Sequence, residues 1–148
     1  DPPKVLPTFR KKVLTLYNDN TLYDAVRLMS RKSYTQIPIL DEEERYLDLL
    51  TSNTIVRWLG ANVPPDSGQI QNVDIDEVLK YKESSNVCLF ITAQTNFLEV
   101  LEIFDKYKNM AKKLEALIIT ENGRDDEEFM GIITNWDLPV IYDALDRY

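Results

Sequence analysis

Apolar and polar positions in the first half of the chain follow the order strand, helix, strand, strand, helix. Short apolar runs at 13–16, 37–40 and 46–50 predict strands, and an acidic turn joins the last two as a hairpin. Between the first two runs, apolar residues recur at the spacing of one helical face: Leu22, Ala25, Val26 and Met29. A second helix is predicted from Ser52 to Leu59, ended by Gly60.

The second half of the chain repeats this order. Apolar runs predict strands at 87–92, 117–119 and 129–133. A helix is predicted from Phe97 to about Met110, and a closing helix from Trp136 to Leu145. Both halves are therefore predicted as β-α-β-β-α, which indicates a tandem repeat.

The segment between the repeats is rich in proline, glycine and polar residues, as is typical of a linker. We expect a first repeat at about 10–60, a linker at 61–72 and a second repeat at 73–148, with 73–79 as a short docking segment. Each repeat alone would expose one face of its sheet. The predicted fold class is therefore α+β: two three-stranded sheets stacked around a shared core in one domain, 1–148, with the helices outside and neither half stable alone.

Composition excludes several classes of function. The chain has 25 acidic and 17 basic residues and a formal charge of −8, which argues against nucleic-acid binding. It has no histidine, which removes Ser-His-Asp and Cys-His catalysis and histidine-based zinc sites. The single Cys88 cannot form an internal disulfide and is predicted to be an inert buried thiol. We predict no catalytic residue and no metal site.

No apolar stretch reaches the roughly 20 residues that a membrane-spanning helix needs. The chain begins without methionine and without the apolar region of a signal peptide. We therefore expect no direct membrane insertion, a cytoplasmic location, and a chain trimmed from something longer.

Two segments resemble the motifs of a known family. Residues 13–41, which include V-L-T-L, T-L and Y-T-Q-I-P-I-L-D, resemble the first half of a CBS domain. Residues 131–138, G-I-I-T-N-W-D-L, resemble the closing motif of a second one. The resemblance covers about 10–146 and implies a CBS pair, or Bateman module: a pseudo-twofold pair of sheets with two clefts between the repeats.

Such modules commonly bind adenosine nucleotides, regulate an attached domain or a partner protein, and form homodimers. The resemblance therefore implies AMP, ADP, ATP or a cyclic dinucleotide as candidate ligands, with no required cofactor. The predicted nucleotide-binding residues are Thr15, Tyr34, Thr35, Ile37, Pro38, Thr134, Asn135 and Asp137.

Thr134 and Asp137 carry the most specific part of this prediction. An ionised Asp has two acceptor oxygens that suit the two ribose hydroxyls, which is the role of the family's acid at the matching position. The same Thr-x-x-Asp spacing is also a good helix start, so capping is the alternative. Tyr34 is predicted either to stack on adenine or to be an ordinary half-buried aromatic residue, and Pro38 is expected to shape its strand.

The first repeat departs from this motif, so the two clefts are predicted to be unequal. Thr51 retains the cap, but Thr54 stands at the position of the acid and Asp48 at the position of Gly131. A glycine there would let a ligand approach the backbone, and a side chain would obstruct it. Phe90 stands where the first repeat has Thr15. The cleft of Thr51, Thr54 and Phe90 is therefore predicted to be weak, empty or adapted to another ligand.

Other charged and aromatic residues have mainly structural interpretations. The acidic runs 41–44 and 125–128 fall in equivalent turns and are predicted to be solvated rather than to bind divalent cations. The basic residues at 31–32 and 112–113 suit helix ends, although one pair could reach a ligand phosphate. The two tryptophans, at 58 and 136, are expected to pack in the core or in a dimer.

Three functions follow from these observations. The first is a regulatory module that binds an adenosine nucleotide. The alternative is a ligand-free dimerisation or interaction module with decayed clefts. An enzyme is disfavoured, because no paired catalytic constellation is present.

Overall fold

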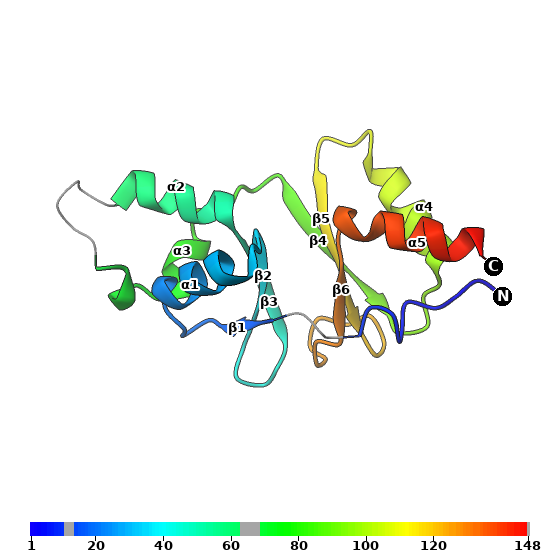
Figure 1. Cartoon of the computed structure of the whole chain (residues 1–148), viewed down its shortest axis with the longest axis horizontal. Helices are drawn as coiled ribbons and strands as arrows, with labels where there is room; N and C mark the ends of the chain where they lie inside the picture. Colours follow the sequence, from blue (N-terminus) through cyan, green and yellow to red (C-terminus); the bar gives the residue numbers. More distant parts are fainter. Residues whose placement is uncertain (11–13, 63–68, 148) are drawn as a thin grey trace. The chain divides into compact units, whose positions relative to one another are not determined.

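The computed structural model of the chain describes residues 1–10, 14–62 and 69–147. These residues form two units, each with a three-stranded sheet (Figure 1). The first-repeat unit comprises the described residues 14–62 and 69–83, and the second-repeat unit comprises 1–10 and 84–147. The predicted α+β class with two three-stranded sheets is confirmed.

The first-repeat unit follows the predicted β-α-β-β-α order. Its middle strand, β2, lies between a parallel β1 and an antiparallel β3. A capping box starts α1, because the Thr21 hydroxyl accepts from the Asp24 N–H at 3.1 Å and the Thr21 N–H donates to the Asp24 carboxylate at 3.0 Å. The elements are β1 (Leu16–Tyr17), α1 (Leu22–Lys32), β2 (Gln36–Leu40), β3 (Tyr46–Thr51), α2 (Ser52–Asn62), the 3-10 helix η1 (Ile70–Asn72) and α3 (Ile75–Leu79).

The second-repeat unit has the same topology. Its middle strand, β5, lies between a parallel β4 and an antiparallel β6. Asn96 and Glu99 form the capping box of α4 with bonds of 2.9 and 3.1 Å. The elements are β4 (Asn86–Thr92), α4 (Phe97–Tyr107), β5 (Lys113–Thr120), β6 (Gly131–Ile133), the 3-10 helix η2 (Asn135–Asp137) and α5 (Leu138–Asp146).

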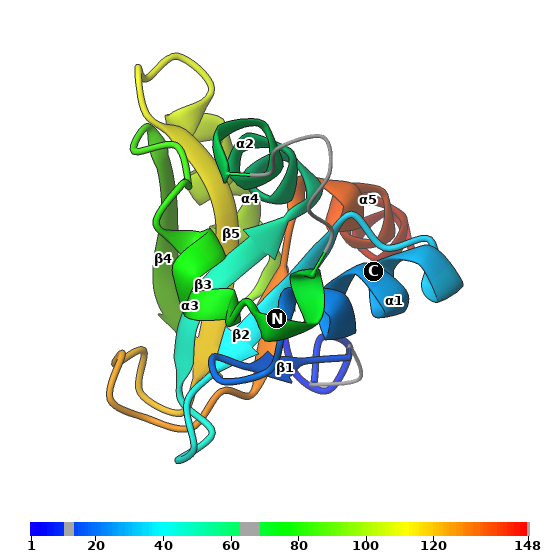
Figure 2. The ribbon, with the colours of Figure 1, turned by 90° about the vertical axis from the view of Figure 1, so that its left-hand side faces the viewer.

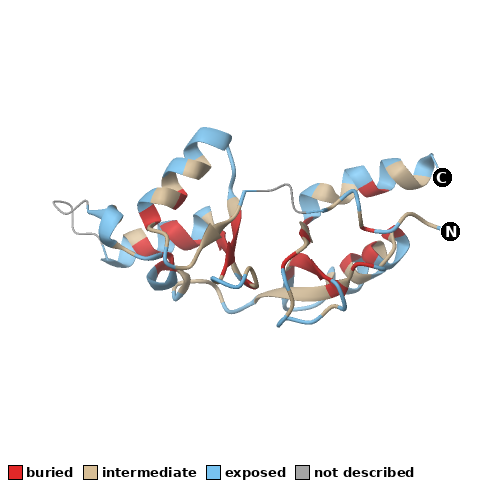
Figure 3. Cartoon of the chain, turned by 90° about the horizontal axis from the view of Figure 1, so that it is seen from below, coloured by how far each residue is buried: buried red, intermediate tan, exposed pale blue. Residues whose placement is uncertain are grey.

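In each unit the helices lie against the sheet and enclose a cluster of buried side chains (Figures 1 and 2). Leu22 and Ala25 of α1 pack with Ile37, Ile39 and Leu50 of the strands, and all five are fully buried. Buried positions lie on the strands and on the inner helix faces (Figure 3). The helical spacing read from the sequence therefore marks the side of α1 that packs inward.

Each unit also contains a segment that precedes the other repeat in the sequence. In the first-repeat unit this segment is 73–83, which includes α3. The Leu22 N–H donates to the Val73 carbonyl at 2.7 Å, and the Ile75 N–H donates to the Asn20 carbonyl at 2.9 Å. Ile75 is fully buried, as is Val78 one turn later.

The N-terminal segment, residues 1–10, packs in the same manner in the second-repeat unit. The Val5 N–H donates to the Thr95 carbonyl, and the Phe97 N–H donates to the Pro3 carbonyl, both at 2.8 Å. Val5 is fully buried, and the rings of Phe9 and Phe97 are 5.8 Å apart. The compact units therefore do not coincide with the sequence repeats, because apolar residues that precede each repeat enter the buried cluster of the other unit.

The helix that Gly60 was expected to end continues to Asn62. That prediction is wrong, because Gly60 stays helical and the Asn62 side-chain amide donates to the Trp58 carbonyl at 3.0 Å. A glycine within a helix costs some stability but does not by itself end the helix.

Other element boundaries also shift. β6 begins at Gly131 rather than at residue 129, and the closing helix begins with the 3-10 turn η2 before α5. The strand predicted at 13–16 overlaps β1 only at Leu16. Val13 lies outside the described residues, as do 63–68 of the predicted linker. Cys88 is half-buried on the edge strand β4 rather than fully buried, and its thiol donates to a Glu115 carboxylate oxygen at 3.7 Å.

Candidate functional site

The turn after β6 brings Thr134 and Asp137 together. Thr134 has an extended backbone, with φ −121° and ψ 175°, and the chain then enters η2. The Thr134 N–H donates to Asp137 Oδ2 at 2.8 Å, and the Thr134 hydroxyl donates to the same oxygen at 3.4 Å. The carboxylate therefore caps the turn, as the alternative interpretation of the Thr-x-x-Asp spacing predicts.

The cap leaves Asp137 with unused capacity as an acceptor. Burial raises the pKa of its carboxyl above the ordinary value, and the bonds from Thr134 only partly offset that rise. Both bonds reach Oδ2, and no residue in the described part of the chain donates to Oδ1. A half-buried carboxylate with one such oxygen is a favourable acceptor for a ligand hydroxyl.

The residues next to this carboxylate differ in exposure. Thr134 is 6% exposed, whereas Asn135 and Trp136 face solvent, Trp136 with 81% of its surface exposed. Trp58, the tryptophan on α2 of the first repeat, is instead packed in the core of its unit. The expectation of packing in the core or in a dimer is confirmed for Trp58, which lies in the core. Trp136 lies on the solvent side of η2, so it is not a core residue, and its packing in a dimer stays a prediction.

The equivalent turn of the first repeat is built from two threonines. The Thr54 N–H donates to Thr51 Oγ1 at 3.2 Å, and the two hydroxyl oxygens are 3.1 Å apart. Thr54 is 2% exposed, so its hydroxyl is satisfied inside the protein. This turn supplies no carboxylate. Phe90, the third residue predicted for the weaker cleft, lies half-buried on β4 in the other unit.

Gly131 makes room for the N-terminal segment. A Cβ at Gly131 would collide with the Phe9 carbonyl oxygen and would lie 3.0 Å from the Phe9 carbonyl carbon and 3.3 Å from Ile119 Cδ1. The expectation that this glycine opens the backbone to a ligand is therefore corrected. The protein's own backbone fills the space that the missing side chain leaves.

At the equivalent position of the first repeat, the contact is an ion pair. Asp48, at the position equivalent to Gly131, forms an ion pair with Lys82 Nζ at 2.5 Å. Lys82 follows α3 in the segment that precedes the second repeat. In both units, a segment from outside the repeat therefore contacts this position. Phe9 contacts Gly131 in the second-repeat unit, and Lys82 contacts Asp48 in the first-repeat unit.

The candidate residues of the first repeat lie around the start of β2. Tyr34 is 40% exposed, and its N–H donates to the Met29 carbonyl at 3.2 Å, which closes α1. The Thr35 carbonyl accepts from the Ser52 N–H at 2.9 Å, which holds the start of β2 against the start of α2. Tyr34 therefore presents an accessible ring on a fixed backbone.

Two other candidates of this repeat are less accessible. Ile37 is fully buried in the core of its unit, and Pro38 is buried beside it on β2. Thr15 is half-buried directly before β1. The candidate set thus divides between the units: Thr15, Tyr34, Thr35, Ile37 and Pro38 lie in the first-repeat unit, and Thr134, Asn135 and Asp137 lie in the second-repeat unit.

Both acidic runs form turns in which a carboxylate of the run accepts hydrogen bonds from neighbouring residues. Asp41 accepts from the Arg45 N–H and Nε, both at 2.9 Å. Glu127 accepts from the Asn122 N–H and side-chain amide at 2.9 and 2.7 Å and from the Arg124 N–H at 3.0 Å. Burial alone would raise the pKa of Glu127, but these bonds lower it to about 2. The sequence does not predict this role of Glu127, because its place in a hairpin turn is the only signal for it.

Three further features of the described residues concern metal sites, membrane-spanning helices and surface hollows. Ranges 1–10, 14–62 and 69–147 hold no group of three or more carboxylate or thiol side chains placed to bind a metal ion. No helix in these ranges has the length and apolar character required to cross a membrane. One surface hollow lies around Tyr17 and Asp41 in the first-repeat unit, and another lies around Met130 in the second-repeat unit. None of the candidate nucleotide residues lines either hollow.

Comparison with known proteins finds a family match in the first half of the chain. Residues 8–61 match the family model of the CBS domain. The magnesium transporter MgtE of Thermus thermophilus is 26% identical over 98 residues, a match that covers 66% of this chain and 21% of that protein. The match therefore spans about a fifth of the length of this curated relative.

Solved structures share the fold over nearly the whole chain. AcuB from Vibrio cholerae, assigned to acetoin utilization, superposes with a TM-score of 0.71 at 20% identity, covering 99% of this chain and 95% of that one. CbpB, solved in complex with c-di-AMP, superposes with a TM-score of 0.66 at 16% identity, covering 97% of this chain and 90% of that one.

Proposed function

We propose that this chain, whose residues 8–61 match the CBS-domain model and whose fold is that of CBS-domain pairs, is a regulatory module that binds an adenosine-containing nucleotide. AMP, ADP, ATP and cyclic dinucleotides are the candidate ligands. The complex of CbpB with c-di-AMP supports the last class, since that neighbour has the same fold.

The observation that carries this proposal is the hydrogen bonding of Asp137. Thr134 holds Oδ2 in place, which orients the carboxylate, while Oδ1 accepts from no described residue. A ribose diol would donate to this carboxylate and relieve the desolvation that raises its pKa. The cap and the ligand role are therefore compatible, because they use different oxygens.

We propose that the chain has one such site rather than two. The equivalent position in the first repeat holds Thr54, whose hydroxyl is buried against Thr51. A hydroxyl pair that is already satisfied cannot replace a carboxylate as a two-oxygen acceptor. The second cleft is expected to bind nucleotide weakly or not at all.

Isothermal titration calorimetry with AMP, ADP, ATP and c-di-AMP tests the proposal. Asp137→Asn removes the charge and one acceptor oxygen, and Asp143→Asn is its matched control, because Asp143 lies on α5 in an exposed ion pair with Arg147. We expect one site per chain, at least about tenfold weaker in Asp137→Asn and unchanged in Asp143→Asn. Two equal sites, or equal binding by both variants, would contradict the proposal.

We further propose that the module works in the cytoplasm as a homodimer and regulates a partner or a fused domain without catalysing a reaction. Regulation requires that the nucleotide bind two states of the module with different affinities. Incubation with ATP should yield no product, and turnover would contradict this part of the proposal.

A second candidate is a ligand-free dimerisation module, and the exposed side of the closing helix favours it. Trp136 and Val140 lie one turn apart and are 81% and 49% exposed. Sedimentation velocity of the full chain and of Trp136→Ser, each with and without ATP, separates the two candidates. A dimer that is unchanged by ATP and dissociates in Trp136→Ser supports the ligand-free dimerisation module. An oligomeric state that changes when ATP is added supports the nucleotide-binding module.

A further inference from the structure

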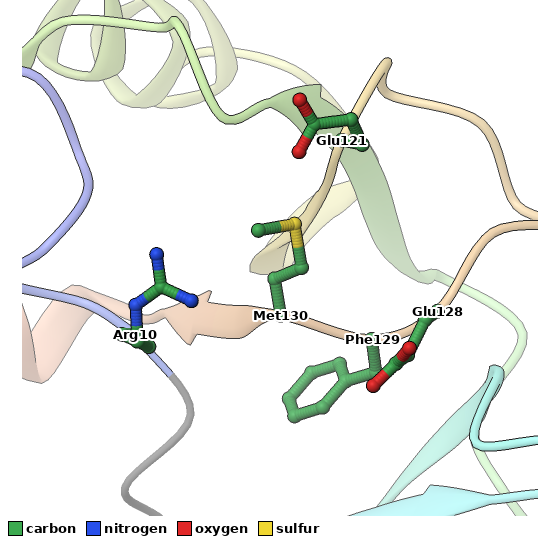
Figure 4. A pocket seen from close by; sticks show the side chains of 5 residues that line it. All are labelled: Arg10, Glu121, Glu128, Phe129 and Met130. Atoms are coloured by element: carbon green, nitrogen blue, oxygen red, sulfur yellow. The ribbon is translucent and has the colours of Figure 1, made fainter.

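A hollow in the second-repeat unit lies apart from the candidate nucleotide site. It has a volume of about 380 Å³ and is lined by Arg10, Glu121, Glu128, Phe129 and Met130 (Figure 4). Met130 precedes β6 and Thr134 follows it, so the two residues are roughly 13 Å apart along an extended strand. The hollow therefore adjoins the opposite end of β6 from Asp137.

The walls of the hollow are held by backbone contacts. Arg10 follows Phe9, whose carbonyl rests on Gly131, and the Arg10 N–H donates to the Pro7 carbonyl at 3.1 Å. The Met130 N–H donates to the Ile119 carbonyl at 2.9 Å, which places Met130 next to the end of β5. The hollow therefore joins the N-terminal segment to the hairpin of β5 and β6.

Three charged side chains surround this hollow without pairing. Figure 4 shows the charged ends of Arg10 and Glu121 on either side of the Met130 side chain, whereas the Glu128 carboxylate lies beside the Phe129 ring. Within the described residues, none of the three forms an ion pair or a side-chain hydrogen bond. Elsewhere in the same hairpin, charges are paired, as in Arg124 and Asp126 at 2.7 Å. The cation and the two anions of the hollow are therefore available to a ligand.

The floor between these charges is apolar. Phe129 is 1% exposed and Met130 is half-buried, with its thioether inside the hollow in Figure 4. Small-molecule sites combine such apolar surface with a few polar groups, and their volumes begin near roughly 300 Å³. The hollow is therefore large enough for a small organic molecule.

From this arrangement we propose that the hollow binds a free α-amino acid with an apolar side chain. The ligand carboxylate meets the Arg10 guanidinium, its ammonium group meets the Glu121 carboxylate, and its side chain lies on Met130. A nucleotide phosphate is disfavoured because it would meet two carboxylates, and a simple cation is disfavoured because it would meet Arg10. The carboxylate and the ammonium group of a zwitterionic amino acid complement the positive and the negative side chains of the hollow.

Methionine methyl NMR of the full chain tests the proposal, because Met29 and Met110 are internal controls. Met29 lies on α1 in the other unit, and Met110 lies in the exposed segment after α4. On titration with L-phenylalanine to about 10 mM, the Met130 methyl signal should shift and saturate while the other two stay fixed. L-Phenylalaninamide, which lacks the carboxylate, and N-acetyl-L-phenylalanine, which lacks the ammonium group, should bind at least about tenfold more weakly.

Variants then test each charge separately. Arg10→Gln and Glu121→Gln should each weaken L-phenylalanine binding at least about tenfold. These side chains are exposed, so the variants should remain folded, which an unchanged Tm of the full chain shows. A Met130 signal that does not move, or equal binding of all three compounds, would overturn the proposal. Equal binding by the wild-type chain and the charge variants would overturn it as well.

Discussion

Replacing Gly131 with alanine tests the packing of the N-terminal segment on the second-repeat unit. The added Cβ would collide with the Phe9 carbonyl oxygen, which belongs to backbone and cannot swing aside as a side-chain end can. Either the strand and the segment separate under strain, at a cost of about 1–3 kcal/mol, or the segment detaches. Detachment would expose Val5, whose complete burial contributes about 1.5–3 kcal/mol.

Strain and detachment would each lower the free energy of unfolding by a similar amount. For a chain of this length, ~1–3 kcal/mol corresponds to a fall in Tm of roughly 2–12 °C. Gly60→Ala is the matched control, because a Cβ at Gly60 meets nothing within 4 Å in the middle of a helical turn. Alanine there should raise stability by about 0.5–1 kcal/mol. Thermal and urea unfolding measure both variants, and a Gly131→Ala chain as stable as the wild type would refute the reasoning.

Three further variants test the site and the unit boundaries. Asp137→Ala should lose about 0.5–2 kcal/mol of stability with its cap, whereas Asp137→Asn keeps an acceptor for the Thr134 N–H and removes a charge that burial disfavours. Urea unfolding should therefore find Asp137→Asn at least as stable as the wild type, and a larger loss in Asp137→Asn than in Asp137→Ala would contradict the capping geometry. The pKa of Glu127 is about 2 against an ordinary 4.5, so its stabilising effect is present above about pH 4.5 and is lost as pH falls toward 2. Glu127→Gln should flatten this part of the stability profile measured by urea unfolding, and an unchanged slope would be evidence against the turn contacts. Ile75→Ala should cost about 2–5 kcal/mol because Ile75 is fully buried in the first-repeat unit, and a negligible loss on urea unfolding would place α3 outside that core.

Local periodicity was enough to predict most of the elements. The recurrence of Leu22 and Ala25 at helical spacing predicts the buried face of α1, and both residues are fully buried. Thr21 and Asp24 form its capping box with groups three residues apart. Both features depend on residues that are close in the sequence, and the buried face of α1 was predicted from the sequence for this reason.

The exchange of segments between the units depends on distant contacts instead. Val5 bonds to Thr95, ninety residues further along the chain, and Lys82 pairs with Asp48. An apolar residue in a sequence indicates burial but not the sheet against which it will pack. The role of Gly131 could not be predicted for the same reason, because the atom that requires the glycine belongs to Phe9.

The candidate site was predictable to an intermediate degree. The spacing of Thr134 and Asp137 predicts that they meet, and their bond of 2.8 Å confirms the cap. Their role toward a nucleotide remains a proposal, since it rests on the resemblance and on the open oxygen of Asp137. Ile37 shows why a motif does not by itself identify ligand contacts. It occupies a motif position but is fully buried in the core of its unit.

Native mass spectrometry of the full chain with ATP and with c-di-AMP tests the central claim most directly, because it counts bound nucleotides. The account predicts one nucleotide per chain in the wild type, one in Asp143→Asn and none in Asp137→Asn at the same concentration. Two nucleotides per chain, none in the wild type at any concentration, or one retained in Asp137→Asn would contradict it.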